Sequence, residues 1–377
     1  MASVDRWKGN KWRARWRTTA GESRSQVFGR RIDAERHLTA TEHAKMTGGY
    51  VDPGAGRLTF EAWVDRWTPT IVDLRATTLD RDLRIVRNHL VPRFGTTPLA
   101  KVTTSAVRAW VAEMNGTGDH APATVRKAGQ VMAKVMAAAV SDGLIARSPC
   151  DGVRLPAESR REMVFLDAGQ VLELVDVIDE HHQTLVLSAA YLGLRWGELA
   201  GLRTERVDVL RRRVAVLEQL VEVSGALSFG PPKTAAGRRS VTVPAFLVPY
   251  LEAQLLQRSS GGLVFPAPGG GPLRRSNFTR RVWTPATRRA GVDGLRFHDL
   301  RHTAVALAIG AGAHPKSIQE RMGHSSVTVT LDRYGHLFPH LDERIADGLD
   351  AAWSAAVVSR SCHADTPAPV LAAVDAG

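Results

Sequence analysis

Two turn-rich stretches interrupt this chain and limit how it can fold. The first, residues 51–56, is rich in proline and glycine, and the second, residues 156–162, is charged and begins with a proline. Such clusters break helices and strands and are typical of linkers. Because 377 residues also exceed one ordinary domain, separate cores are expected. The predicted domains are residues 1–50, 57–153 and 162–358, followed by a mobile tail at residues 359–377.

The first predicted domain contains a strictly alternating segment, Lys-Trp-Arg-Ala-Arg-Trp-Arg, at residues 11–17. In a strand this alternation places both tryptophans on one face and the basic side chains on the other. A second short strand is expected at residues 26–30, followed by a helix that Asp33 caps and that ends near Thr47. Residues 1–50 hold 11 Lys and Arg against 5 Asp and Glu, so 11 minus 5 leaves +6, half of the chain's surplus. One face of this small sheet is therefore predicted to be cationic, and a merely solvated face is the alternative.

The rest of the chain is predicted to be mainly helical. Apolar residues recur at helical spacing over residues 59–70, 77–90, 103–115 and 121–142. Within the first of these stretches, Trp63 and Trp67 are interpreted as core residues. A further helix should begin near Asp167. Short runs of β-branched residues predict strands at residues 214–217, 220–223 and 240–243. The predicted fold class is therefore α+β, mainly α with small β-sheets.

The chain is strongly basic, with 50 Lys and Arg against 38 Asp and Glu and an isoelectric point near 10.3. This surplus suits a polyanionic partner, although a genome rich in arginine codons would also produce it. The two cysteines, Cys150 and Cys362, lie in different predicted regions, which favours a reducing cytoplasm over a disulfide framework. No apolar run reaches the roughly 18 residues of a membrane span, so no membrane association is expected.

Five short motifs in the second half contain the candidate catalytic residues. In chain order they are Gly193-Leu194-Arg195-Trp196-Gly197-Glu198-Leu199, Pro232-Lys233-Thr234, His298-Asp299-Leu300-Arg301-His302-Thr303, Gly323-His324-Ser325-Ser326 and Asp332-Arg333-Tyr334-Gly335-His336. Each motif alone would be a weak signal, but the ordered series is specific.

This ordered series resembles the catalytic domain of the tyrosine recombinases, the phage integrase family, over roughly residues 160–350. One departure is that ten positions separate His324 from Tyr334, one more than in many members. The resemblance implies an enzyme that breaks a DNA phosphodiester with a tyrosine and uses no metal, nucleotide or other cofactor. A covalent 3′-phosphotyrosine would retain the ester energy, so that the strand can be rejoined to a new partner. It also implies an arm-site DNA-binding domain, a helical core-binding domain and a catalytic domain, in that order.

The resemblance assigns the central roles to one tyrosine and two arginines. Tyr334 would be the nucleophile. Arg195 and Arg301 would hold the phosphate, because a planar guanidinium donates two parallel hydrogen bonds and stays charged. Glu198 would orient Arg195, since residues three apart share a helix face. The alternative for this last pair is an ordinary surface ion pair.

The remaining motif residues are expected to handle protons. His298 would accept or share the proton of the tyrosine, His324 would donate to a nonbridging oxygen, and Lys233 would protonate the departing 5′ oxygen. His302 is interpreted as a core histidine. Its i, i+4 spacing from His298 also fits a zinc pair, but no third ligand is evident.

The resemblance further implies double-stranded DNA attachment sites as partner and four copies of the chain on two duplexes. A host DNA-bending protein or an excision directionality factor would be accessory partners, and the cytoplasm of a bacterial host, at the nucleoid, is the expected location. The basic front domain favours integration of a phage or mobile element genome over a rival enzyme class, the type IB topoisomerases. A DNA-binding regulator that kept an integrase scaffold is a second, non-enzymatic rival. The predicted DNA contacts of the front domain are Lys11, Arg13, Arg15 and Arg17.

Overall fold

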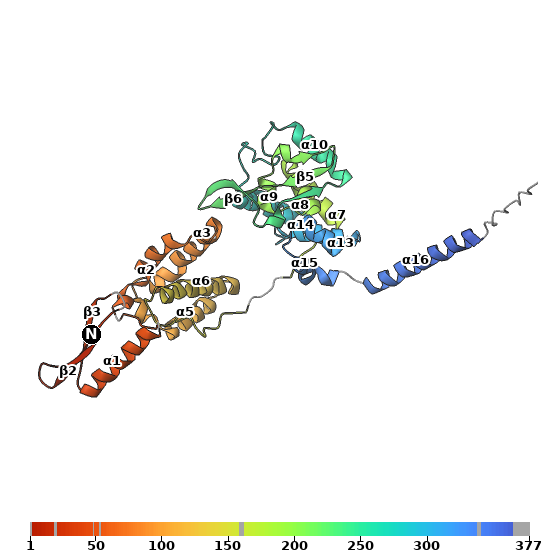
Figure 1. Cartoon of the computed structure of the whole chain (residues 1–377). Helices are drawn as coiled ribbons and strands as arrows, with labels where there is room; N and C mark the ends of the chain where they lie inside the picture. The colour runs from red at the N-terminus through yellow and green to blue at the C-terminus, as the bar shows by residue number, and fades with distance from the viewer. Residues whose placement is uncertain are drawn as a thin grey trace, which may run out of the picture. The chain divides into compact units, whose positions relative to one another are not determined.

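The computed structural model contains two compact units (Figure 1). The first comprises Met1–Arg161 with Val223–Gly225, and the second Glu162–Glu222 with Ala226–Gly377. The division of the first unit into two domains stays a prediction, although that unit holds two separate hydrophobic clusters. The structure describes residues 2–18, 21–47, 49–52, 54–157, 162–337 and 341–364, with side chains in the last range described only for 346–358.

A small antiparallel sheet stands at the front of the first unit. Its strands, in the order β1-β2-β3, are β1 (Ser3–Trp7), β2 (Lys11–Arg17) and β3 (Ser23–Phe28). The predicted alternation is confirmed, because Ala14 and Trp16 are buried whereas Lys11, Arg15 and Arg17 are exposed. Strand β1 is an addition to the prediction, and β3 begins three residues before the predicted start at residue 26.

Helix α1 (Arg31–Met46) packs on the apolar face of this sheet. There the Trp16 indole donates a hydrogen bond to the Tyr50 hydroxyl at 2.8 Å. The predicted cap at Asp33 is wrong, since Arg30 occupies the N-cap position and Asp33 lies in the first turn. Asp33 instead pairs with the Arg30 guanidinium at 2.9 Å.

The four helical stretches predicted after the first linker are confirmed. The helices of this region are α2 (Phe60–Trp67), α3 (Ala76–Ile85), α4 (Val91–Phe94), α5 (Thr104–Gly116) and α6 (Pro122–Ser141). Threonine side chains cap two of them, Thr59 on α2 and Thr103 on α5. Trp63 is a core residue as predicted, and its indole donates to the Val135 carbonyl at 3.1 Å.

The second unit is mainly helical and is built around α8. Its helices are α7 (Ala168–Val177), α8 (Glu180–Leu192), α9 (Trp196–Ala200), α10 (Val248–Leu256), α11 (Arg275–Phe278), α12 (Thr284–Arg289), α13 (Asp299–Gly310), α14 (Pro315–Met322), α15 (Val327–Tyr334) and α16 (Leu341–Ala364). Asp167 and Gln170 cap α7 reciprocally, which confirms the predicted start. Helix α8 packs against α7, α9, α10 and α13.

Two small sheets accompany these helices. One has the order β4-β5-β8, with β4 (Val207–Asp208), β5 (Arg213–Val216) and β8 (Arg239–Thr242), and the other pairs β6 (Gln219–Val223) with β7 (Ala226–Gly230). The predicted strands are confirmed as β5, β6 and β8. Strands β4 and β7 were not predicted, because one has two residues and the other is rich in small or polar residues.

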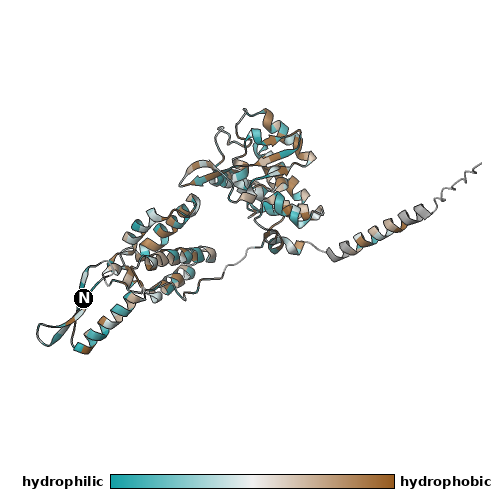
Figure 2. Cartoon of the chain, in the orientation of Figure 1, coloured by the Kyte–Doolittle hydropathy of each residue, from teal (hydrophilic) through white to brown (hydrophobic). Residues whose placement is uncertain are grey.

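The last described element, α16, continues to Ala364, past the boundary predicted at Val358. Its described side chains include exposed apolar ones, among them Leu349, Trp353 and Val357. Figure 2 shows how hydrophobic and hydrophilic residues are distributed over the described elements. The predicted tail beyond Ala364 and residues 158–161 of the second predicted linker lie outside the described residues. None of the described helices has the length and apolar character needed to cross a membrane.

Candidate active site

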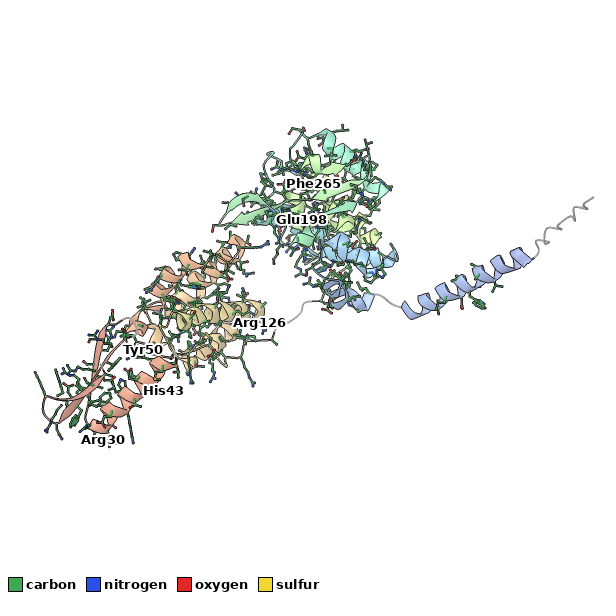
Figure 3. All side chains as sticks on the ribbon, viewed as in Figure 1. Arg30, His43, Tyr50, Arg126, Glu198 and Phe265 are labelled. Atoms are coloured by element: carbon green, nitrogen blue, oxygen red, sulfur yellow. The ribbon has the colours of Figure 1, made fainter. Side chains whose placement is uncertain are left out.

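The centre of the candidate site is Glu198, a carboxylate inside the second unit that is 1% exposed (Figure 3). Helix α9 begins at its N-cap residue Arg195, and Glu198 lies one turn later. Glu198 accepts hydrogen bonds from the Arg195 backbone N–H at 2.9 Å and from Arg195 Nη1 at 2.8 Å. Burial acts to raise the pKa of Glu198, but the guanidiniums of Arg239 and Arg195 lower it overall. The carboxylate is therefore ionised and orients Arg195.

The second partner of Glu198 is Arg239, which is not among the residues predicted from the sequence. It starts β8 and donates to Glu198 Oε2 at 2.9 Å and to Glu198 Oε1 at 3.1 Å. Its Nε also donates to the Arg321 carbonyl at 2.7 Å, so one side chain joins β8, α9 and α14. The Arg239 side chain is 6% exposed. Neither spacing nor a helical pattern distinguishes it from its neighbour Arg238.

A third guanidinium, that of Arg301 on α13, is buried at the same place. It donates to the carbonyl oxygens of Gly193 and Met322. Burial and the nearby charge of Arg195 lower the pKa of Arg301 to about 9, so the group stays charged at neutral pH. Arg195 and Arg239 pair with Glu198, and the Glu198 charge also acts on the nearby Arg301. Three guanidiniums thus lie around one carboxylate, and 3 minus 1 leaves a local surplus of +2. An anion at this site would relieve their repulsion.

Two glycines let the segments around these arginines approach closely. Gly193 and Gly323 both have positive φ, 65° and 63°. A Cβ on Gly193 would lie 2.5 Å from the Met322 sulfur, and a Cβ on Gly323 would lie 2.6 Å from the Ala236 carbonyl oxygen. Ala236 belongs to the segment between β7 and β8 that also carries Lys233, whose side chain is exposed. The fold therefore brings the lysine-bearing segment against the turn that precedes α15.

His324 follows this turn and is buried. Its Nδ1 lies 2.9 Å from the Thr330 hydroxyl on α15, which fixes the ring and leaves Nε2 for another partner. Burial lowers the pKa of His324 to about 3, and the charges of Arg301 and Arg195 add to the effect. His324 is therefore neutral at physiological pH.

Tyr334 ends α15, and its side chain is 1% exposed. Its hydroxyl lies 2.6 Å from His302 Nδ1. Burial raises the pKa of Tyr334, while Arg301 and Arg333 oppose that rise. His302 is buried, as expected of a core histidine, and its hydrogen-bond partner is the Tyr334 hydroxyl.

His298 occupies the N-cap position of α13, one turn before His302. The two rings are 5.1 Å apart, edge to face. Desolvation of the ring lowers the pKa of His298 to about 4, helped by the charges of His302 and Arg301, although part of the residue stays open to solvent. Among the described residues, no group of three His, Cys, Asp or Glu side chains comes together around this pair.

The N-terminal sheet presents a second candidate surface. The predicted basic residues lie on one face, but β1 adds Asp5 directly opposite Arg13. Arg13 donates to Asp5 at 2.6 Å, and its guanidinium lies 3.8 Å from the Trp7 ring centroid. The hydrogen bond from Arg13 lowers the pKa of Asp5. The face is therefore less cationic than predicted, with Lys11, Arg15 and Arg17 as its exposed bases.

The geometry of the second unit defines a class of enzyme. Clustered guanidiniums can neutralise the charge of a phosphoryl group, and a tyrosine with a neighbouring histidine can supply a nucleophile with a proton acceptor. Comparison with known proteins identifies the family. The phage integrase family matches residues 164–340, and the N-terminal SAM-like domain of phage integrases matches residues 59–115.

Individual relatives agree with these matches. The chain is 29% identical over 324 residues to an integrase of Mycobacterium phage FRAT1, covering 84% of this chain and 93% of the relative. The Tn1549 transposon integrase in complex with transposon right end DNA has a TM-score of 0.63 at 22% identity, covering 73% of this chain and 94% of that one. A lambda integrase tetramer bound to a Holliday junction has a TM-score of 0.54 at 17% identity, covering 87% and 96%. The two structures share the fold, which confirms the predicted α+β class. The chain belongs to the phage integrase family and is a site-specific tyrosine recombinase.

Proposed function

We propose that this recombinase is an integrase, which joins a phage or mobile element genome to host DNA through Tyr334. The observation that carries the proposal is the local surplus of +2 around Glu198. The charge of Arg301, which belongs to this cluster, also acts to lower the pKa of the buried Tyr334. A phosphodiester needs such a site, because its negative charge grows on the nonbridging oxygens as the nucleophile attacks. Arg195 is the outermost guanidinium of the cluster, with 32% of its side chain exposed, and meets the phosphate first.

Cleavage follows from these positions. Arg195 and Arg301 hold the nonbridging oxygens while the Tyr334 oxygen bonds to phosphorus and the bond from phosphorus to the 5′ oxygen breaks. Lys233 gives a proton to that departing oxygen. The products are a 3′-phosphotyrosine and a free 5′ hydroxyl. Attack by the 5′ hydroxyl of another strand reverses these steps, so rejoining needs no nucleotide cofactor or metal ion.

His324 contributes a neutral hydrogen bond to the phosphate. If the Thr330 hydroxyl donates to Nδ1, then Nε2 carries the proton of the neutral ring and can donate it to a nonbridging oxygen. Thr330 is fully buried on the helix that ends at Tyr334, so one helix positions both the donor and the nucleophile.

Double-stranded attachment sites are the proposed DNA partner, bound by four copies of the chain. The fold of the lambda integrase tetramer on a Holliday junction supports this assembly. The exposed bases of β2 would bind the distal arm sites. A DNA-bending protein or a directionality factor would assist the reaction, which would take place at the nucleoid of a bacterial host.

Strand exchange distinguishes integration from its rivals. The assay mixes two duplexes that carry attachment sites with a supercoiled plasmid and measures recombinant and relaxed products separately. Recombinant product that disappears in Tyr334→Phe supports the proposal. Tyr250→Phe is the matched control, since Tyr250 is a partly exposed tyrosine on α10 of the same unit. Relaxation without recombinants would indicate a topoisomerase, and unchanged activity of Tyr334→Phe would remove the proposed nucleophile.

The arm-site assignment has its own test. Changing the exposed bases Lys11, Arg15 and Arg17 to Gln should lower affinity for distal sites and lower the salt dependence by about 0.9 per lost phosphate contact. The matched control changes three exposed bases of α1 and its cap, Arg30, Arg31 and Arg36, to Gln. Equal losses in both triple variants would mean that the sheet face has no special role.

A further inference from the structure

The hydrogen bond at Tyr334 points to a catalytic residue that the family resemblance did not supply. We infer that His302, rather than His298, is the base that takes the proton of Tyr334 during cleavage. The inference rests on the proposed function, since it assigns one more role at the same site. Its basis is the 2.6 Å contact between His302 Nδ1 and the Tyr334 hydroxyl.

The position of His302 on α13 explains why it, and not His298, meets the tyrosine. Residues four apart on a helix point to the same side, so both rings face the same way, but His302 lies one turn deeper. His302 is 6% exposed, whereas part of His298, at the helix start, stays open to solvent. The deeper ring reaches the end of α15, where Tyr334 is enclosed.

The resting protonation state suits a base. Burial lowers the pKa of His302 and raises the pKa of Tyr334, so the ring is neutral and the phenol keeps its proton. With the phenol O–H as donor, Nδ1 is the acceptor, and the ring proton lies on Nε2. The base and its substrate proton are therefore already in hydrogen-bonding contact.

The charges that face His302 are mixed. From the start of α13 the Asp299 carboxylate favours the charged imidazolium, whereas Arg296 and Arg301 disfavour it, as does Arg333 from α15. Asp299 is 1% exposed and pairs with Arg296 at 2.7 Å. A DNA phosphate bound to Arg301 would offset that positive charge, so the arrival of substrate makes His302 a stronger base.

The step balances without another reagent. As the Tyr334 oxygen bonds to phosphorus, its O–H bond breaks and the proton moves to His302 Nδ1, giving an imidazolium. The bond from phosphorus to the 5′ oxygen breaks, and Lys233 protonates that oxygen. In rejoining, the imidazolium returns the proton to Tyr334 as the tyrosine leaves phosphorus.

The first experiment measures single-turnover formation of the covalent adduct from pH 6 to 9 with His302→Asn. Asparagine places an amide oxygen near the position of Nδ1 and so keeps a hydrogen bond but no base. The adduct rate at neutral pH should fall by about 100-fold or more, and it should then rise tenfold per pH unit while the wild-type rate levels off. The matched control is His182→Asn, a buried histidine of α8 outside the site. A wild-type rate and pH profile in His302→Asn would overturn the inference.

A substrate with a sulfur at the bridging 5′ position separates the two proton transfers, because a thiolate leaves without an acid. On this substrate the rate of adduct formation by Lys233→Ala should recover, whereas the rate of His302→Asn should stay low. Recovery of both would show that His302 does not act on the tyrosine. Adduct formation by Tyr334→Phe, in contrast, would overturn the proposed function itself.

A measurement on the unaltered protein covers the case in which His302→Asn does not fold. Nitrogen-15 NMR of the histidine side chains should find Nδ1 of His302 unprotonated and hydrogen bonded, with Nε2 carrying the proton. Tyr334→Phe should move this Nδ1 resonance and leave that of His182 in place. A proton on Nδ1 in the resting protein would contradict the assignment.

Discussion

Replacing Glu198 by Gln tests how strongly the buried ion network holds the site together. The change nearly preserves shape but removes the one carboxylate shared by Arg195 and Arg239. Removing one partner from a buried ion pair costs about 3–5 kcal/mol, against about 0–1 kcal/mol for an exposed pair. Arg195, with 32% of its side chain exposed, can regain water, but Arg239, at 6%, cannot. We expect the free energy of unfolding to fall by an amount near the lower limit, about 3 kcal/mol. In a unit of this size that corresponds to a drop of roughly 6–12 °C in the melting temperature.

A double-mutant cycle that combines Glu198→Gln with Arg239→Met isolates the interaction free energy between these two side chains. Unfolding in urea, followed by amide hydrogen exchange in α8 and α13, assigns the transition to the second unit. The double variant should lose less free energy of unfolding than the sum of the losses of the two single variants, by about 1–3 kcal/mol. Glu218→Gln is the control, because its pair with Arg203 is partly exposed on both sides and should contribute little. Additive costs, or a loss below about 1 kcal/mol for Glu198→Gln, would refute the buried network.

Three further predictions concern the same site. Arg195→Lys and Arg301→Lys should each slow adduct formation by about 100-fold or more while DNA affinity in gel shifts stays near wild type; equal loss of binding would mean that they supply only affinity. Thr330→Val leaves His324 Nδ1 without its partner and should lower stability by about 1–3 kcal/mol as well as the cleavage rate, whereas unchanged melting would count against the contact. Because the folded pKa of Glu198 lies below the ordinary glutamate value of 4.5, its stabilisation is complete above that pH and disappears as pH falls through the folded pKa; acid unfolding of Glu198→Gln should lack this component.

Periodic features of the sequence predicted the fold well. The alternation at residues 11–17 and the helical spacing of α2, α3, α5 and α6 report directly on which side of an element is buried. The strands that were not predicted, β1, β4 and β7, carry little of this information because they are short and hold few large apolar residues. The sequence predicts a tail after Val358, where little apolar patterning remains, yet α16 continues to Ala364.

The site was predictable only as far as the ordered motifs extend. The structure places Arg195, Glu198, Arg301 and His324 together, but the partners of these residues depend on side-chain directions between distant elements. Arg239 belongs to the site only because β8 meets α9, and Thr330 only because α15 folds back on the turn before it. The hydrogen bond between His302 and Tyr334 was not predicted, because spacing along α13 says nothing about which ring reaches Tyr334.

The most direct test of the account is to trap the enzyme on nicked suicide DNA and identify the modified residue by peptide mass spectrometry. We expect one DNA-linked peptide, joined at the Tyr334 oxygen to a 3′ phosphate and formed equally well in the presence of a metal chelator. A linkage at any other residue, or an adduct that forms only with an added divalent cation, would contradict it.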